Sequence, residues 1–297
     1  MVFLGKILAA VFAWGTYVVL RLAGWKHKTV LANAKHVASP VNYDELLINL
    51  TRHVGELLFC FGTFKKLPHD FSAYPCCVDG WTFDFAEGSA PVLEKMRKGG
   101  IFLTAHYGNY EAMGPWLCRL GIPMVASYIP VKPKWLNNIL ERKIRAVDGL
   151  SYSVDARTPR DFLRILNDGK LFCLLSDQDS RIPSSLPGTL LGQPANVNPL
   201  PDFLLEHRPQ TPVFICWMEE ICGVRVLHAV EVERAPFPGA AHLVSPAQSN
   251  GASPAQSSSS IVNTQFNKWL EQRILENPNL WYSWTHRRFY SSSPEIY

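Results

Sequence analysis

Residues 101–111 read IFLTAHYGNYE, and this stretch decides the expected fold. The run IFLTA is short and apolar, which is typical of a buried strand, and His106 follows it directly. Gly108 can supply the backbone geometry of a tight turn, and Asn109 can cap the helix whose first turn would contain Glu111. The stretch therefore predicts a strand, a turn and a helix, with polar side chains at the carboxyl end of the strand.

The chain from residue 80 onward continues this alternation of short apolar runs and helical segments. The further segments that carry the pattern are 113–120, 123–128, 135–147, 171–175, 213–217 and 224–232. Strands that alternate with helices indicate an α/β fold, with a mixed sheet that is flanked by helices and largely parallel in its early part. Ligand sites in such sheets lie at the carboxyl ends of the strands, so chemistry is expected just past residues 105 and 175.

The amino-terminal region contains an apolar segment. Residues 7–20, ILAAVFAWGTYVVL, carry no charge, with Lys6 before them and Arg21 after them. The stretch from 2 to 25 approaches the ~20 residues that a bilayer-crossing helix needs if those two side chains snorkel. A secretory signal peptide is the alternative, but residues 24–28, GWKHK, offer no small-x-small cleavage site. We therefore predict a membrane anchor helix at residues 1–25.

Composition and charge indicate a cytosolic body with a mild preference for lipid. The composition is 47% hydrophobic and 18% charged, which is ample for a buried core. The net charge of +4 comes without a long basic run and argues against nucleic-acid binding. Basic residues follow the apolar segment at 21, 26, 28 and 35, so the positive-inside rule predicts a cytoplasmic body. The seven cysteines form no C-x-x-C pair, which is typical of reduced thiols.

Three regions are expected along the chain. The anchor at 1–25 is followed by a helical region at 26–79, in which residues 43–61 have the spacing of an amphipathic helix. The third region, 80–297, is the expected catalytic domain. Within it, residues 236–260 are rich in Ser, Ala and Pro and repeat SPAQS, so they are expected to form a surface loop. A closing helix is predicted at 261–275, with an aromatic and basic segment at 281–290.

His106 and Glu111 are candidates for acid–base chemistry. On one continuous helix, residues five apart point about 140° away from each other, so the pair can meet only across the turn. A neutral imidazole so placed is a suitable general base, and a carboxylate beside it stabilises the imidazolium; such a base contributes about 10² to 10⁴ in rate. The alternative is structural, because the helix dipole alone favours Glu111 in a first turn. Spacing alone leaves both readings open.

Five segments resemble, in order, the motifs of the bacterial lipid A biosynthesis lauroyl/myristoyl acyltransferases. TAHYGNYE, residues 104–111, resembles the H-x-x-x-x-D/E motif of that family. The other four are Arg145–Gly149 for R-x-x-x-G, Ser176–Gln178 for the strand-terminal D-Q, Leu191–Ala195 for F-G-x-P-A, and Trp284–Phe289 for W-x-H-R-R-F. Together they cover about residues 80 to 290.

The resemblance implies a glycerolipid-acyltransferase-like fold and a specific reaction. An acyl chain would pass from acyl carrier protein to a hydroxyl of a membrane glycolipid, with a lipid A precursor as the expected acceptor, at the cytoplasmic face of the inner membrane. His106 would be the base and Glu111 its orienting partner. No cofactor and no covalent acyl-enzyme are implied, and the sequence has no G-x-S-x-G elbow and no cysteine beside His106.

Further residues are expected at the substrate by resemblance, namely Gly108, Asn109, Arg145, Asp177, Gln178, Arg287 and Arg288. Arg145 would bind phosphate or the pantetheine of the carrier, with a solvated helix arginine as the alternative. Asp177 would orient Arg145 or the acceptor; the D-x-D spacing with Asp179 lacks companion ligands, so no metal is expected. Arg287 and Arg288 would contact lipid phosphate, although paired arginines are also common on surfaces.

One departure from the family pattern bears on the acceptor. The family often has Y-R-P after the strand that follows the catalytic helix, whereas residues 128–130 here are Tyr-Ile-Pro. This leaves open another glycolipid acceptor, such as a phosphatidylinositol mannoside, or a catalytically weak lipid-binding protein. Independently of this departure, the sequence also leaves open a thioester hydrolase. Any acyl-chain pocket is expected near Met113, Trp116 and Leu117, which fit an ordinary core equally well.

Overall fold

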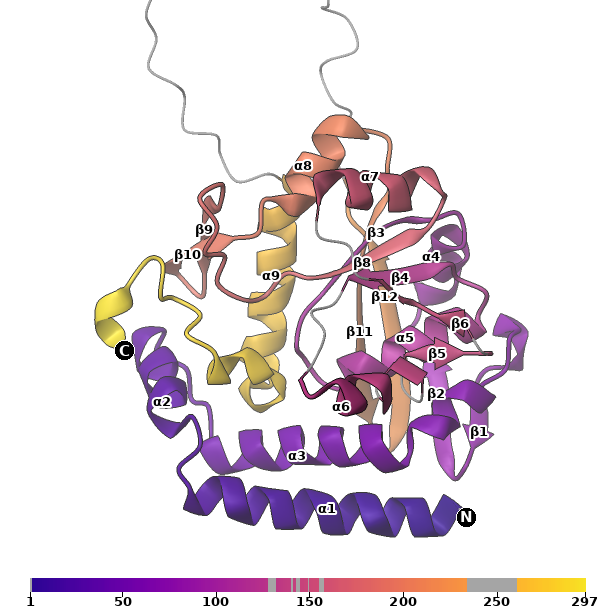
Figure 1. Ribbon diagram of the computed structural model, residues 1–297, viewed down its shortest axis with the longest axis horizontal. Coiled ribbons are helices and arrows are strands. Elements are labelled where there is room, and N and C mark those ends of the chain that lie inside the picture. The colour runs from indigo at the N-terminus through magenta and orange to yellow at the C-terminus, as the bar shows by residue number, and fades with distance from the viewer. Residues whose placement is uncertain are drawn as a thin grey trace, which may run out of the picture.

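The computed structural model describes residues 2–127, 132–139, 141–142, 145–148, 150–154, 158–233 and 261–297. Within them, eight strands form one mixed sheet in the order β1-β2-β12-β11-β3-β8-β4-β7 (Figure 1). These strands are β1 (Cys76–Val78), β2 (Trp81–Phe85), β3 (Gly100–Thr104), β4 (Met124–Ser127), β7 (Ser153–Val154), β8 (Leu171–Leu175), β11 (Val213–Ile221) and β12 (Val224–Glu231). Two small hairpins accompany the sheet, β5 (Ala146–Val147) with β6 (Leu150–Ser151), and β9 (Leu186–Leu190) with β10 (Gln193–Val197).

The sheet is parallel from β11 through β3, β8 and β4 to β7. On its other side the β11–β12 and β1–β2 pairs are antiparallel and the β12–β2 pair is parallel. β3 pairs in parallel with β8 and β11, and β4 pairs in parallel with β8 and β7. β11 and β12 are antiparallel because only Cys222 and Gly223 join them, and their φ angles of 50° and 78° make the tight turn that suits a hairpin. The predicted α/β class with a mixed sheet flanked by helices is confirmed.

The central strand β3 is covered on both faces. Ile101 and Leu103 lie in a cluster with Phe266 of α9 (Ile261–Glu276), whereas Phe102 lies in a second cluster with Trp116 of α5 (Tyr110–Arg119). This two-sided burial explains why the strand reads as a continuous apolar run. α7 (Pro159–Asn167) and α8 (Leu200–His207) contribute to the first cluster, and α4 (Ser89–Met96) contributes to the second.

The predicted helix at 135–147 is confirmed at its beginning and wrong at its end. α6 (Lys134–Ile139) covers only its beginning, and residues 146–147 form β5 instead. Asp148 has a φ of 50°, which a β-hairpin turn requires and a helix excludes, and Val147 is buried against the core cluster of α5. The other predicted segments are confirmed with shifted ends.

The amino-terminal helices form one edge of the molecule. Figure 1 shows α1 (Val2–Leu22) lying along α3 (Tyr43–Phe59), with α2 (His27–His36) between them in the chain. α3 begins at residue 43 because Asn42 accepts hydrogen bonds from the Asp44 and Glu45 amides. Among the described residues, Leu4–Leu22 is the one helical stretch that is long and apolar enough to cross a membrane, a test that a signal sequence also passes.

The remaining expectations concern one domain boundary and two segments of the chain. The sheet begins with β1 at Cys76, which pairs with β2, so the expected boundary at residue 80 falls inside a hairpin. The predicted loop at 236–260 and the Tyr-Ile-Pro departure at 128–130 lie outside the described residues.

Candidate active site

The parallel pairing of β3 with β8 brings His106 and Asp177 together. The pairing joins Thr104 to Leu175, and each polar residue stands two positions beyond those partners. The Nδ1 atom of His106 lies 2.8 Å from Oδ1 of Asp177, and the backbone amide of His106 donates to Oδ2 at 3.1 Å. The carboxylate that holds the histidine is therefore Asp177.

Asp177 lies in a fully buried cage of hydrogen-bond donors. The indole Nε1 of Trp281 donates to its Oδ2 at 2.9 Å, and the hydroxyl of Ser283 donates to the same atom at 2.7 Å. Burial raises the pKa of Asp177, but the charge of His106 and these hydrogen bonds outweigh it and hold the pKa well below its usual range. Asp177 is therefore ionised at neutral pH.

The carboxy-terminal segment fixes the turn that follows β3. Tyr107 forms an isolated antiparallel bridge with Trp281, and the amide of Tyr282 donates to the carbonyl of His106 at 2.8 Å. The amide of Gly108 donates to the carbonyl of Leu280 at 3.0 Å. The segment thus holds the backbone of the turn and supplies two of the donors to Asp177.

His106 has the environment of a general base. Burial lowers its pKa, but the charge and hydrogen bond of Asp177 and the charge of Glu111 raise it, so the pKa lies above its usual value. Because Asp177 is ionised, Nδ1 carries the proton and donates it to the carboxylate, which leaves the lone pair on Nε2. The side chain keeps 21% of its surface exposed, so a substrate can approach it.

The predicted role of Glu111 as the orienting partner of His106 is corrected. Glu111 lies in the first turn of α5 as predicted, but its carboxylate lies 3.5 Å from Nη2 of Arg145. Arg145 also lies 3.4 Å from Glu141. Because of the strand register, Asp177 lies against Nδ1 of His106. Glu111 affects the imidazole only through its charge.

Arg145 is a partly buried residue of the site rather than a solvated helix arginine. Its side chain is 19% exposed, and Asp177 is paired with His106, so the expectation that Asp177 orients Arg145 is wrong. Arg145 and Glu111 also line a cavity of about 70 Å³ together with Met113 and Cys173. Trp116 and Leu117, the other expected pocket residues, are buried in the core cluster beneath it.

Asn109 does not cap the helix with its side chain, contrary to the prediction. It occupies the N-cap position of α5, but its side chain turns toward α3, where Oδ1 accepts from Nδ1 of His53 at 3.0 Å and Nδ2 donates to Glu56 at 3.2 Å. Burial lowers the pKa of His53 to about 4, so His53 is neutral at pH 7. Asn109 therefore ties the turn to α3.

Gly108 is required by the backbone. Its φ is 58°, and a Cβ atom there would lie 2.6 Å from the carbonyl oxygen of Met218. Both conditions exclude a side chain, because left-handed backbone and a backbone clash each cost free energy. Gly108 and Asn109 line a polar cavity of about 270 Å³ behind the turn, with His53, Glu56 and Arg225 among its other walls.

Replacing Gly108 by alanine should lower the free energy of unfolding by about 1 to 3 kcal/mol or more, since strain and clash add. Urea denaturation followed by circular dichroism measures this. Gly62→Ala is the matched control, because its Cβ would meet no atom within 4 Å and its φ is ordinary. An equal, small effect of both substitutions would contradict the assignment of strain to Gly108.

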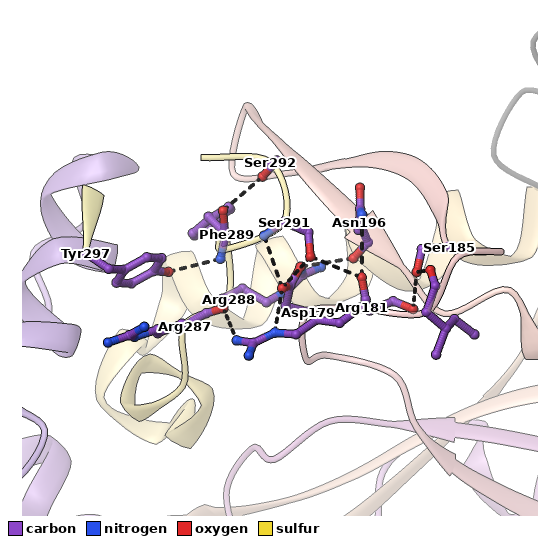
Figure 2. A network of polar contacts seen from close by, with 12 residues as sticks. Asp179, Arg181, Ser185, Asn196, Arg287, Arg288, Phe289, Ser291, Ser292 and Tyr297 are labelled. Atoms are coloured by element: carbon purple, nitrogen blue, oxygen red, sulfur yellow. Dashed lines mark hydrogen bonds and ion pairs between the residues drawn. The ribbon is translucent and has the colours of Figure 1, made fainter. Parts of the chain in front are cut away.

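Arg287 and Arg288 have different environments, although they are neighbours (Figure 2). Arg288 is fully buried, and its Nη1 donates to the carbonyl of Asn196 at 3.0 Å. Burial lowers its pKa, which the charges of Asp177 and Asp179 partly offset. The expected contact of Arg288 with lipid phosphate is therefore wrong, whereas Arg287 is exposed and remains available for one.

Asp179 belongs to a separate network from Asp177. Its Oδ2 accepts from Nε of Arg181 at 3.1 Å and from the amide and hydroxyl of Ser291 at 3.2 and 2.8 Å (Figure 2). Asp177 and Asp179 thus have different partners, and Gln178 between them is partly buried. In the part of the chain that the structure describes, no group of His, Cys, Asp and Glu side chains is suited to a metal ion.

Arg288→Ala should lower the free energy of unfolding by about 2 to 4 kcal/mol, because it leaves buried polar groups and a cavity behind. Arg287→Ala is the adjacent control and should stay within about 1 kcal/mol of the parent protein. Thermal or urea unfolding of the two variants checks this. Comparable effects would mean that burial does not distinguish the two arginines.

Sequence reasoning missed four residues that build the site, Trp281, Ser283, His53 and Glu56. The aromatic and basic character of 281–290 was visible, but nothing in it indicated donors to Asp177.

In comparisons with known proteins, no protein-family model and no curated protein matches the chain.

Proposed function

We propose that the protein is a membrane-bound O-acyltransferase that moves a fatty acyl chain from the thioester of acyl carrier protein to a hydroxyl of a glycolipid. We take a lipid A precursor as the acceptor and the cytoplasmic face of the inner membrane as the location. The observation that carries the proposal is the His106–Asp177 pair, with Nδ1 bound to a buried carboxylate and the Nε2 lone pair remaining. The five motifs in order support the choice of substrates.

The proposed reaction has one base and no covalent intermediate. Nε2 of His106 removes the proton of the lipid hydroxyl, and the resulting oxygen nucleophile attacks the thioester carbonyl. The carbon–sulfur bond then breaks, and the leaving thiolate takes the proton back from the imidazolium. Asp177 stabilises the imidazolium and fixes its tautomer, as an ionised carboxylate does in hydrolytic triads.

Two further groups have roles in the proposal. Arg145 supplies a positive charge for a phosphate of the acceptor or of the pantetheine arm, and Glu111 positions that guanidinium. Cys173 lines the small cavity, but burial raises its pKa far above the usual value, so it is a thiol and a poor nucleophile. This supports direct transfer to the acceptor.

The test is transfer of an isotope-labelled acyl chain from acyl carrier protein to defined lipids, read by mass spectrometry. One arm contains a lipid A precursor and another contains a phosphatidylinositol mannoside. Acylation of the first is the expected result, and acylation of the second alone would move the proposal to another glycolipid. Release of free fatty acid without an acceptor would indicate a thioester hydrolase, and lipid binding without turnover would indicate a non-catalytic lipid-binding protein.

A further inference from the structure

α1 is docked along α3 over its whole length. Gly5 packs against the Phe59 backbone, where an added Cβ would lie 3.0 Å from the carbonyl oxygen, and a Cβ on Gly55 would lie 2.6 Å from the carbonyl oxygen of Ala9. At the other end, Arg21 forms an ion pair with Asp44. Small residues let the two backbones approach closely, and the order of these contacts makes the helices antiparallel, as Figure 1 shows.

The basic residues that bracket the apolar run hold α1 to the body of the protein. Lys6 donates to the carbonyl of Gly80 at 3.1 Å and lies 4.1 Å from the centre of the Trp81 ring. Arg21 is engaged by Asp44 at the opposite end. Both side chains therefore bind protein, so neither is placed to snorkel toward a separate leaflet.

The partner of α1 is unsuited to the interior of a bilayer. α3 carries the charged residues Asp44, Arg52 and Glu56. Glu56 also binds Arg225 at 2.8 Å and Asn109 of the turn that follows β3, which carries His106 and is the proposed catalytic turn. A docked α1 that crossed the membrane would carry these groups into hydrocarbon, where each charge costs several kcal/mol. The docked arrangement and a spanning helix therefore exclude each other.

The outer face of α1 is an apolar stripe. Val11, Trp14 and Leu22 are 63%, 70% and 83% exposed, and Leu4 and Leu8 continue the same face at helical spacing. Ala9 and Ala13 are buried on the opposite face. A stripe of this length on an exposed helix is typical of a surface that binds a lipid boundary.

Exposed lysines of α2 complement this stripe. Lys28, Leu31 and Lys35 stand at i, i+3 and i+7, so they share one helix face, and all three are exposed. α2 follows α1 after a short turn, and in Figure 1 it rises from that end of α1 past the start of α3. Cations on the helix that follows an apolar stripe suit the anionic headgroups above an acyl layer.

We propose that α1 lies in the plane of the membrane surface, with its outer face in the boundary between headgroups and acyl chains and with the lysines of α2 on anionic lipid. The protein then sits on one leaflet and does not cross the bilayer. This rests on the membrane attachment proposed above but not on acyl transfer. It also places the catalytic turn one helix away from the lipid surface, because His53 and Glu56 of α3 bind Asn109.

The first experiment locates the amino terminus. The full chain with an epitope tag at its amino terminus is produced in bacteria, and sealed, inverted inner-membrane vesicles are treated with protease. An in-plane α1 leaves the tag on the same side as the body, so the tag is removed without detergent. Protection of the tag until detergent is added would show a spanning helix and overturn the inference, whereas absence of the protein from the vesicles would overturn membrane attachment itself.

The second experiment tests lipid as the occupant of the apolar face. The double variant Val11→Glu with Trp14→Glu should bind vesicles of phosphatidylethanolamine and phosphatidylglycerol at least about tenfold more weakly, because two apolar side chains lose their burial. Leu275→Glu is the matched control, since Leu275 is 74% exposed on α9. All these positions are exposed, so the unfolding midpoint should stay unchanged.

The lysines are tested on the same vesicles. Lys28→Gln with Lys35→Gln should weaken binding by about thirtyfold, because each lysine near an anionic surface contributes about 1 kcal/mol. Lys268→Gln on α9 is the control, and vesicles of phosphatidylcholine alone should not distinguish the variants. Unchanged binding of both double variants would overturn the inference. The parent protein could instead be a dimer. If Val11→Glu with Trp14→Glu made it a monomer without weakening vesicle binding, the apolar face of α1 would bind a second copy of the chain and not lipid.

Discussion

His106→Ala is expected to lower acyl transfer by about 10² to 10⁴-fold, the range that a positioned general base contributes. In the proposed mechanism the imidazole Nε2 removes the proton of the acceptor hydroxyl, because Nδ1 is held by the buried Asp177. The measurement is the initial rate of acyl transfer at saturating donor. His207→Ala is the matched control, because His207 is exposed at the end of α8 and its Nδ1 bonds the carbonyl of Phe203.

The outcome distinguishes loss of chemistry from loss of fold. The variant should stay folded, with a free energy of unfolding lower by about 1 to 3 kcal/mol, because the buried Asp177 loses the imidazole but keeps its other three donors. A folded His106→Ala protein with a rate within a few-fold of the parent would show that another group acts as the base.

Asp177→Asn is expected to lower transfer by about 10³-fold, since an amide cannot fix the correct tautomer or stabilise the imidazolium. It should also change the pH dependence. His106 must be neutral to act, so activity in the parent is lost as pH falls through a pKa above 6.5. The charge of Asp177 raises that pKa, so its removal should move the acidic limb of kcat/KM to lower pH.

Two further variants sharpen this test. Glu111→Gln should move the limb in the same direction but by less, because the charge of Glu111 is a smaller cause of the raised pKa. Asp179→Asn should leave the limb in place, because Asp179 binds Arg181 and Ser291 and does not contact His106. A larger shift from Glu111→Gln than from Asp177→Asn would return the orienting role to Glu111.

The sequence predicts those parts of the fold whose burial leaves a local pattern. β3 and β8 are largely buried and therefore appear in the sequence as apolar runs. α3 is predicted because its apolar residues recur at helical spacing. β9 contains Pro187 and Gly188, which weaken any strand signal, so its hairpin was not predicted. The helix α7 was missed although Thr158 and Asp161 form a capping box that the sequence displays.

The sequence places His106 and Asp177 each at the end of its own strand, but it does not show which of the candidate residues contact one another. His106 follows a recognisable strand, and Asp177 follows another, but their contact depends on β3 and β8 being neighbours in register across 71 residues. Glu111, five residues away, was favoured as the partner because TAHYGNYE resembles the H-x-x-x-x-D/E motif. Strand order is a property of the whole sheet, so local spacing could not decide between the two carboxylates.

The cage around Asp177 has a consequence for how the protein is made. Ser283 lies 106 residues after Asp177 in the chain, and Trp281 lies 104 residues after it. During translation, His106 and Asp177 leave the ribosome well before the two donors that complete the carboxylate's surroundings. The nascent chain therefore carries both members of the pair without the segment that holds them, and the complete site forms only after that last part of the polypeptide has been synthesised and has folded back onto the turn.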